Sequence, residues 1–207
     1  MSLAKLLQLA SPTLPVGAYS YSGGLEAAVE AGIVRDAATA QAWIGDVLEF
    51  SLAKLEAPLL YRMLKGEDVD DLFLASRESA ELRAETVQMG FSLRRLLGDL
   101  GLGAQVPEEP SFPAAIACAA KSWGIAPEAA LEAYLWAWVE NQVMAAVKAV
   151  PLGQTDGQRM LLALGEKLGP MVESIQEMTD ADLGNFTPGL ALLSATHETQ
   201  YSRLFRS

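Results

Sequence analysis

The chain has 207 residues, which is enough for one domain with a buried core that needs neither disulfides nor a structural metal. Hydrophobic residues make up 51% and charged residues 20%, so we expect a folded globular protein. The net charge of −11 argues against nucleic acid and against an anionic membrane as partners, because both attract basic surfaces.

The N-terminal part of the chain carries the sequence ASPTLPVGAYSYSGGLEAA at residues 10–28, and no residue from Leu6 to Leu25 is charged. Its prolines and glycines make it a poor membrane-spanning helix. No basic region followed by an apolar run precedes it, so we expect no secretory signal and a cytoplasmic protein. The segment interrupts an otherwise helical pattern and needs an explanation.

Helical patterns begin directly after this stretch. A short helix is expected over 25–31, ended by Gly32, and Asp36 is expected to cap the next helix. Apolar residues then recur at helical spacing from Ile44 to Met63. Pro58 lies inside this pattern, where we expect a kink or a break.

A third helix is expected after Gly66, with Leu82, Met89, Leu93 and Leu96 as its apolar stripe, followed by a Gly- and Pro-rich loop over 98–113. Further helices are expected at 112–123, from Pro127 to before Pro151, at 156–168 and at 170–178. No run alternates with period two for long enough to form a strand. We therefore predict an all-α fold in one domain spanning residues 1–207.

The single cysteine, Cys118, cannot form an intramolecular disulfide, and its small apolar neighbours predict a buried, inert thiol in a reducing compartment. Cys118 and the only histidine, His197, are too few for a His/Cys metal site. The glycines before Leu25 lack the lysine and the preceding strand of a phosphate-binding loop. We therefore expect no metal, no cofactor and no catalytic site.

Two amides, Asn141 and Gln142, fall in an otherwise apolar helix. Buried amides need hydrogen-bond partners, so they belong to a satisfied core network, a polar cavity or an interface between chains. The C-terminal stretch HETQYSRLFRS interleaves aromatic and apolar residues with arginines, a composition that protein interfaces favour. A flexible tail from about 195–207 is the simplest expectation, and a binding role is the alternative.

Four motifs together resemble the urease accessory protein F (UreF) family: LLQLASPTLPVGAYSYSGGLEAAVEAG, RESAELRAETVQMGFSLRRLL, VKAVPLGQTDGQR and HETQYSRLFRS. They occur in the family's order and are spread over nearly the whole chain. The resemblance implies an all-α homodimer without a catalytic site. It also implies a maturation chaperone that binds the scaffold protein UreD (UreH in some species), recruits the nickel-carrying GTPase UreG and helps deliver nickel to the urease apoprotein.

The same resemblance implies that the uncharged Pro/Gly segment is a contact surface, in keeping with the depletion of charge at the centres of protein interfaces. Tyr19 and Arg203 are the residues it assigns to recruitment of the GTPase, and Asn141 and Gln142 are candidates for lining a route for nickel. The remaining partner-binding candidates are Gly23, Gly24, Glu26, Gln200, Tyr201, Ser202, Leu204 and Phe205. For the glycines, positive φ or close backbone approach is a sufficient alternative.

Three other functions compete with this interpretation. A regulator of the partner's GTP hydrolysis would use Arg203 or Arg206 as an arginine finger. An all-α lyase would need a large enclosed pocket lined by the acids of RESAELRAE, residues 77–85. An unrelated helical binding domain would have to carry the four motifs by chance.

Overall fold

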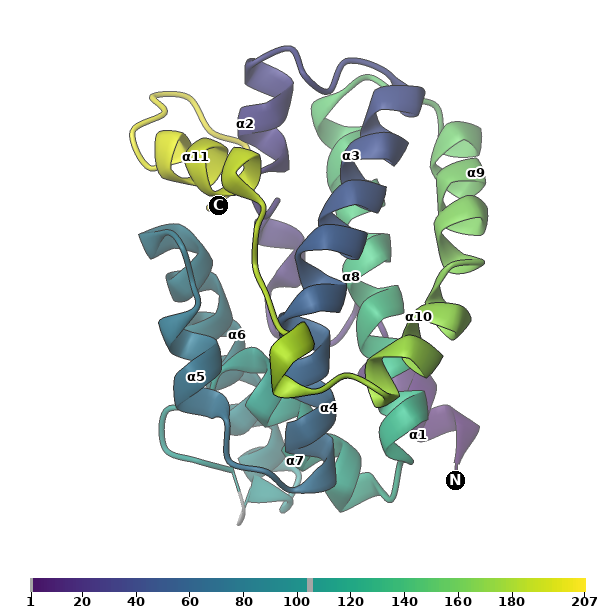
Figure 1. Ribbon diagram of the computed structural model, residues 1–207, viewed down its shortest axis with the longest axis vertical. Helices are drawn as coiled ribbons and strands as arrows, with labels where there is room; N and C mark the ends of the chain where they lie inside the picture. Colours follow the sequence, from purple (N-terminus) through teal and green to yellow (C-terminus); the bar gives the residue numbers. More distant parts are fainter. Residues whose placement is uncertain (1, 104–105) are drawn as a thin grey trace.

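The computed structural model describes residues 2–103 and 106–207, and every regular element among them is helical, which confirms the all-α prediction (Figure 1). Short 3-10 turns separate some of the α-helices: η1 (Ala18–Ser20), η2 (Leu52–Lys54) and η4 (Asp180–Asp182). The α-helices are α1 (Leu3–Leu9), α2 (Leu25–Glu30), α3 (Ala37–Phe50), α4 (Glu56–Lys65), α5 (Asp70–Ala75), α6 (Ala80–Asp99), α7 (Phe112–Trp123), α8 (Pro127–Ala149), α9 (Gln154–Gly165), α10 (Leu168–Gln176) and α11 (Pro188–His197).

Helix α8 forms the centre of the molecule, and α1, α2, α3, α4, α7, α9 and α10 all pack against it. It starts with Pro127 at its first turn, where the missing N–H is not needed, as the sequence predicted. Leu131, Leu135, Val139 and Val143 have no exposed surface. A helix that is apolar around most of its circumference is stable only when other helices cover it.

The break expected near Pro58 occurs just before that residue. Helix α3 ends at Phe50, the turn η2 follows, and α4 starts at Glu56. Pro58 therefore lies in the first turn of α4, where a backbone N–H has no helical partner to lose. Asp36 caps α3 through a capping box with Thr39, as predicted.

Helices α6 and α7 approach closely because α6 carries a glycine at the contact. A Cβ on Gly90 would lie 2.1 Å from the carbonyl oxygen of Pro110 and 2.7 Å from the carbonyl carbon of Ser111. Ser111 is fully buried, and its hydroxyl caps α7 by accepting from the amide of Ala114. Pro110 and Ser111, which contact Gly90, belong to the loop predicted over 98–113. Residues 104 and 105 of the same loop lie outside the described part of the chain.

Three helices were not predicted from sequence: α1, α5 and α11. The first two are short, and only the last three residues of α11 fall in the predicted tail from about residue 195. Cys118, expected to be buried, is half-buried in α7, and partial burial raises the pKa of its thiol. None of the helices in the described part of the chain is both long and apolar enough to span a membrane.

Candidate partner-binding site

The uncharged Pro/Gly segment near the N-terminus turns at glycines that adopt left-handed backbone conformations. Gly17, Gly23 and Gly24 have φ values of 79°, 57° and 85°, which other residues adopt only with strain. Between them, η1 holds Tyr19 on the surface with 74% of the residue exposed. The segment therefore presents an aromatic side chain from a backbone shaped by glycines.

Two of these glycines also sit against other helices. A Cβ on Gly24 would lie 2.9 Å from Leu190 Cδ1 of α11, and a Cβ on Gly23 would lie 3.3 Å from Gln142 Nε2 of α8. Positive φ and close approach are thus sufficient reasons for glycine at both positions. Their part in binding a partner stays a prediction.

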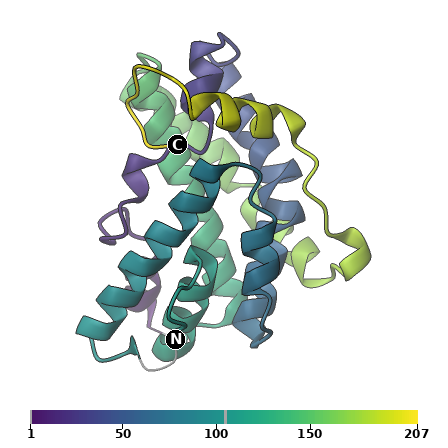
Figure 2. The ribbon, with the colours of Figure 1, turned by 90° about the vertical axis from the view of Figure 1, so that its left-hand side faces the viewer.

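The C-terminal segment, residues 198–207, folds back over the Pro/Gly segment and the end of α6 (Figure 2). The backbone oxygen of Ser207 accepts from the amide of Ser22 at 3.0 Å and from the Ser22 hydroxyl. The amide of Arg206 donates to the carbonyl oxygen of Ser20 at 2.8 Å. Motifs from opposite ends of the sequence therefore form one continuous surface.

Glu26 of α2 receives the backbone of the C-terminal segment. Its Oε1 accepts from the amide of Leu204 at 2.7 Å, and its Oε2 accepts from the amide of Phe205 at 2.8 Å. The residue is only 7% exposed. A carboxylate that accepts backbone N–H bonds in a buried setting makes strong, charge-assisted hydrogen bonds. Glu26 thus holds the segment from beneath, and its part in binding a partner stays a prediction.

His197, at the end of α11, is completely buried between two carboxylates. Its Nε2 lies 3.2 Å from Glu26 Oε2, and its Nδ1 lies 2.6 Å from Glu81 Oε2 of α6. Glu81 is in turn paired with Arg203, whose Nη1 lies 2.7 Å from Glu81 Oε1. The arrangement joins α2, α6, α11 and the C-terminal segment at one point.

Arg203 is fully engaged within the molecule. Besides Glu81, its guanidinium donates to the backbone oxygens of Gln200 and Glu198. One-third of its side chain is exposed. The arginine-finger alternative needs a guanidinium that can reach a bound nucleotide, and Arg203 would have to break these contacts first. The side chain of Arg206 is exposed.

The other side chains of the C-terminal segment divide into exposed and anchored ones. Tyr201 is fully exposed, Ser202 is exposed, and Leu204 is 58% exposed. Phe205 is buried (5% exposed), with Lys148 Nζ 4.6 Å from the centre of its ring. Gln200 is half-buried and donates to the backbone oxygen of Ser202 at 2.8 Å. Phe205 anchors the segment, and Tyr201 and Leu204 face solvent next to it.

Comparison with known proteins identifies the family. A model of the UreF family matches residues 34–165. The chain belongs to the UreF family. It is 57% identical to the urease accessory protein UreF of Azoarcus sp. (strain BH72), over 100% of this chain and 96% of that protein. It is 53% identical to the protein of the same name from Dechloromonas aromatica (strain RCB), over 100% and 98% of the two chains.

The two segments that form the surface, around Tyr19 and around Tyr201, lie outside the residues matched by the UreF model. They lie inside the full-length alignment with the UreF proteins of both bacteria. The UreF family assignment decides against an unrelated helical binding domain.

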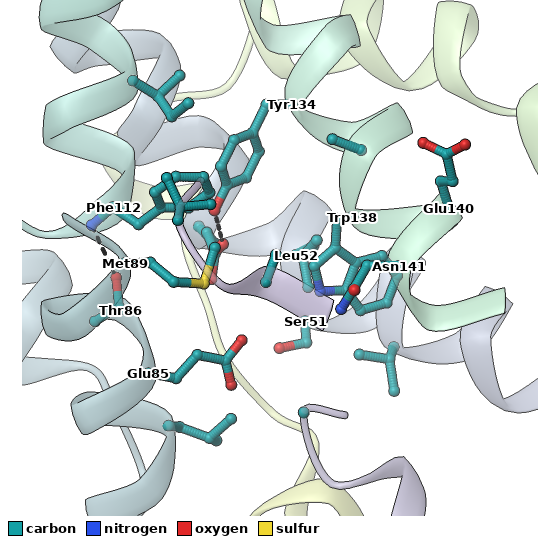
Figure 3. A pocket seen from close by; sticks show the side chains of 18 of the residues that line it. Ser51, Leu52, Glu85, Thr86, Met89, Phe112, Tyr134, Trp138, Glu140 and Asn141 are labelled. Atoms are coloured by element: carbon teal, nitrogen blue, oxygen red, sulfur yellow. Dashed lines mark hydrogen bonds between the residues drawn. The ribbon is translucent and has the colours of Figure 1, made fainter. Parts of the chain in front are cut away.

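A cavity of about 430 Å³ lies beneath this UreF-family surface, between the Pro/Gly segment, α6 and α8 (Figure 3). Its walls are mostly apolar and include Leu52, Met89 and Trp138. The carboxylate of Glu85 points into this space, and the hydroxyl of Ser207 donates to its Oε2 at 2.8 Å (Figure 3). The end of the C-terminal segment therefore contacts a residue that lines the cavity.

Burial raises the pKa of two glutamates around the cavity. Burial raises the pKa of Glu85 to about 7, partly offset by the hydrogen bond from Ser207. Burial also raises the pKa of Glu78. Tyr134 donates to Glu56, whose other oxygen is 2.8 Å from Arg77 Nη1. Of the acids within residues 77–85, Glu78 and Glu85 line this cavity, as the lyase alternative required. The UreF family membership points instead to an accessory protein.

The sequence left open whether Asn141 belongs to a hydrogen-bonded core network, a polar cavity or an interface, and the structure shows features of the first two. Asn141 lines the cavity, and its Nδ2 donates to the carbonyl oxygen of Tyr21 at 3.1 Å. Gln142 is buried, at 3% exposed, against Gly23. Asn141 is therefore a half-buried, hydrogen-bonded residue and a polar group in the mostly apolar wall of the cavity.

The sequence did not reveal three residues that organise this UreF-family site: His197, Glu81 and Glu85. His197 lies in the stretch predicted as a flexible tail, and Glu81 and Glu85 entered the sequence predictions only as acids of the lyase alternative. The one available signal was a single histidine at the end of an apolar helical pattern, Leu190 to Leu193. Within the described residues, no three His, Cys, Asp or Glu side chains form a group that could hold a metal ion.

Proposed function

We propose that this UreF-family chain is a urease maturation chaperone without catalytic activity of its own. Together with the scaffold accessory protein UreD/UreH, it recruits the nickel-carrying GTPase UreG and helps deliver nickel into the urease apoprotein. It acts in the cytoplasm as a homodimer, with Asn141 and Gln142 as candidates for a polar lining along which nickel passes.

The observation that carries the proposal is the surface where the Pro/Gly segment meets the C-terminal segment. Tyr19, Tyr201 and Leu204 are large side chains that remain exposed on it, and aromatic residues of this kind often dominate binding energy. The backbone beneath them is held by Glu26, so the surface is preorganised and loses less entropy on binding.

Co-purification tests the proposal. The full chain and a chain ending at Gln200 are each mixed with the scaffold protein and the GTPase of the same species and analysed by size exclusion with light scattering. We expect a three-protein complex with the full chain and none with the shortened chain. Circular dichroism checks that the shortened chain keeps its helices.

Point variants locate the contact. Tyr19→Ala and Tyr201→Ala are expected to weaken assembly at least tenfold, because each removes an exposed aromatic side chain from the surface. Phe186→Ala is the matched control, since Phe186 is 87% exposed but lies in the connection before α11. Normal assembly by both tyrosine variants, or an equal defect in the Phe186 variant, would contradict the proposed surface. GTP turnover in the same mixtures separates recruitment from regulation of hydrolysis.

A further inference from the structure

The two contacts of the His197 imidazole call for two N–H donors, and a neutral ring has one. Both ring nitrogens lie within hydrogen-bond distance of carboxylate oxygens, Glu81 Oε2 at 2.6 Å and Glu26 Oε2 at 3.2 Å. An ionised carboxylate only accepts hydrogen bonds, and a neutral imidazole has a single N–H. With both carboxylates ionised, both contacts are hydrogen bonds only when the ring carries two protons and a positive charge.

With Glu26 and Glu81 both ionised, the charges of this cluster balance only in that form. Glu26 and Glu81 contribute two negative charges, and Arg203 contributes one positive charge. The imidazolium of His197 brings the sum to zero. With a neutral ring, the cluster keeps a net charge of −1. That charge lies in a buried setting, because the side chain of His197 is fully buried and those of Glu26 and Glu81 are only 9% and 13% exposed. An uncompensated charge in such a setting is strongly destabilising.

The carboxylate that contacts His197 Nε2 is the one that holds the C-terminal segment. Glu26 Oε2 accepts from both His197 and the amide of Phe205. Other ionisable groups lie near the cluster. Glu198 accepts from the amide of Ala80 through Oε1 at 2.9 Å and from Arg203 through its backbone oxygen. Glu85 accepts from Ser207 at the end of the segment, and Lys148 Nζ lies 4.6 Å from the centre of the Phe205 ring. The hydroxyl of Ser194 in α11 bonds to that of Ser79, which has no charge.

We propose that His197 is the positioning residue of the partner-binding surface. In its imidazolium form it holds the C-terminal segment against α2 and α6, and loss of its second proton releases the segment. Presentation of Tyr201 and Leu204 to a partner is then linked to proton binding at one buried histidine. The link to assembly rests on the proposed function, whereas the link between His197 and the segment does not.

His197 can be followed directly because it is the only histidine of the chain. In an untagged full-length protein, its ring resonances in NMR report its protonation without further assignment. Hydrogen exchange of the Leu204 and Phe205 amides, corrected for the intrinsic pH dependence of exchange, reports docking of the segment. We expect protection of both amides to be lost along the titration of His197. Protected amides beside a neutral ring would overturn the proposal.

Charge-balanced variants separate this role from a purely structural one. His197→Gln removes the positive charge and is expected to reduce protection of the two amides roughly 10- to 100-fold at all pH values. Glu81→Gln balances the cluster without a protonated ring, so its segment is expected to stay docked when His197 is neutral. The double variant His197→Gln/Glu81→Gln is expected to regain protection that the single His197 variant has lost.

Two further variants serve as controls. Thr196→Ala changes the exposed neighbour of His197 in α11 and should leave protection unchanged. Glu85→Gln removes the other titrating group that contacts the segment, and the coupling to His197 should persist in it. Failure of the double variant to regain protection, while it remains folded by circular dichroism, would refute charge balance as the cause.

Co-purification of the same variants with the scaffold protein and the GTPase forms the second arm. Assembly is expected to follow amide protection, including its recovery in the double variant. If protection follows His197 but no variant forms a complex at any pH, the proposed function fails and the positioning role stands. If complexes form equally well with docked and released segments, the role of His197 in presenting the surface is wrong.

Discussion

Glu26, Glu85 and His197 show how this UreF-family protein uses buried ionisable groups. Each of the three contacts the C-terminal segment or the element that leads into it. Isolated buried charges are unfavourable, and here each is compensated by backbone amides, a hydroxyl or another charge. The docked segment therefore supplies hydrogen-bond donors to two buried carboxylates, Glu26 and Glu85.

Glu85→Gln is expected to change how stability varies with pH. Burial raises the pKa of Glu85 to about 7 from an ordinary value of 4.5, so the folded protein binds a proton that the unfolded chain releases in this range. The stabilisation from that proton is fully present below about pH 4.5 and is lost as the pH rises to about 7. Glutamine stays uncharged and can still accept from Ser207. The variant should therefore gain up to about 3 kcal/mol at pH 8 and little at pH 5.

Urea unfolding at both pH values measures this difference. Glu132→Gln is the control, because Glu132 is an exposed glutamate on α8 outside the cavity. An equal effect of Glu85→Gln at pH 5 and pH 8 would mean that Glu85 does not titrate in this range.

Among the elements, the close packing of α6 against the start of α7 requires a residue without a side chain at position 90. Gly90→Ala would place a Cβ 2.1 Å from the carbonyl oxygen of Pro110, so the two helices must separate. Overpacking of this kind costs about 1–3 kcal/mol, and backbone atoms cannot move aside as a flexible side chain can. We expect a loss of at least about 2 kcal/mol, measured by urea unfolding.

Gly98→Ala in the same helix is the matched comparison. A Cβ on Gly98 meets no atom within 4 Å. Alanine also favours the helix over glycine by roughly 0.5–1 kcal/mol. This variant should be neutral or slightly more stable, and similar losses in the two variants would show that helix contact is not the reason for Gly90.

Local signals predicted most of the elements, and long-range contacts account for the rest. Pro127, Asp36 and Gly32 mark helix ends through backbone chemistry that acts within a few residues, so α8, α3 and α2 could be predicted. Glu26 and the C-terminal segment are far apart in sequence, so no local pattern could predict their contact. His197 looked polar and terminal because its two carboxylates come from other helices.

For the molecule as a whole, the docked C-terminal segment is expected to contribute to stability without being required for folding. A chain ending at Gln200 loses the buried Phe205 and leaves Glu26 without its backbone donors. Burying one such aromatic side chain contributes about 2 kcal/mol, which corresponds to a fall in Tm of roughly 4–8 °C for a chain of this size. Helical circular dichroism should be retained.

Tyr201→Ala is the reference variant for this measurement, because Tyr201 is fully exposed and its loss should leave Tm unchanged. An unchanged Tm in the shortened chain would indicate that the segment contributes nothing when docked. A collapse of the helical signal would instead make the segment part of the folding core.

The central position of α8 has a consequence for how the protein is made. Helices α1, α2, α3 and α4 all pack on α8, yet the ribosome completes them before α8 begins. Their apolar faces, with Leu9, Leu25 and Leu48 among the buried residues, have no central helix to cover them until residues 127–149 have emerged. Since domains fold only once their core is complete, the nascent chain stays exposed to aggregation for most of its synthesis.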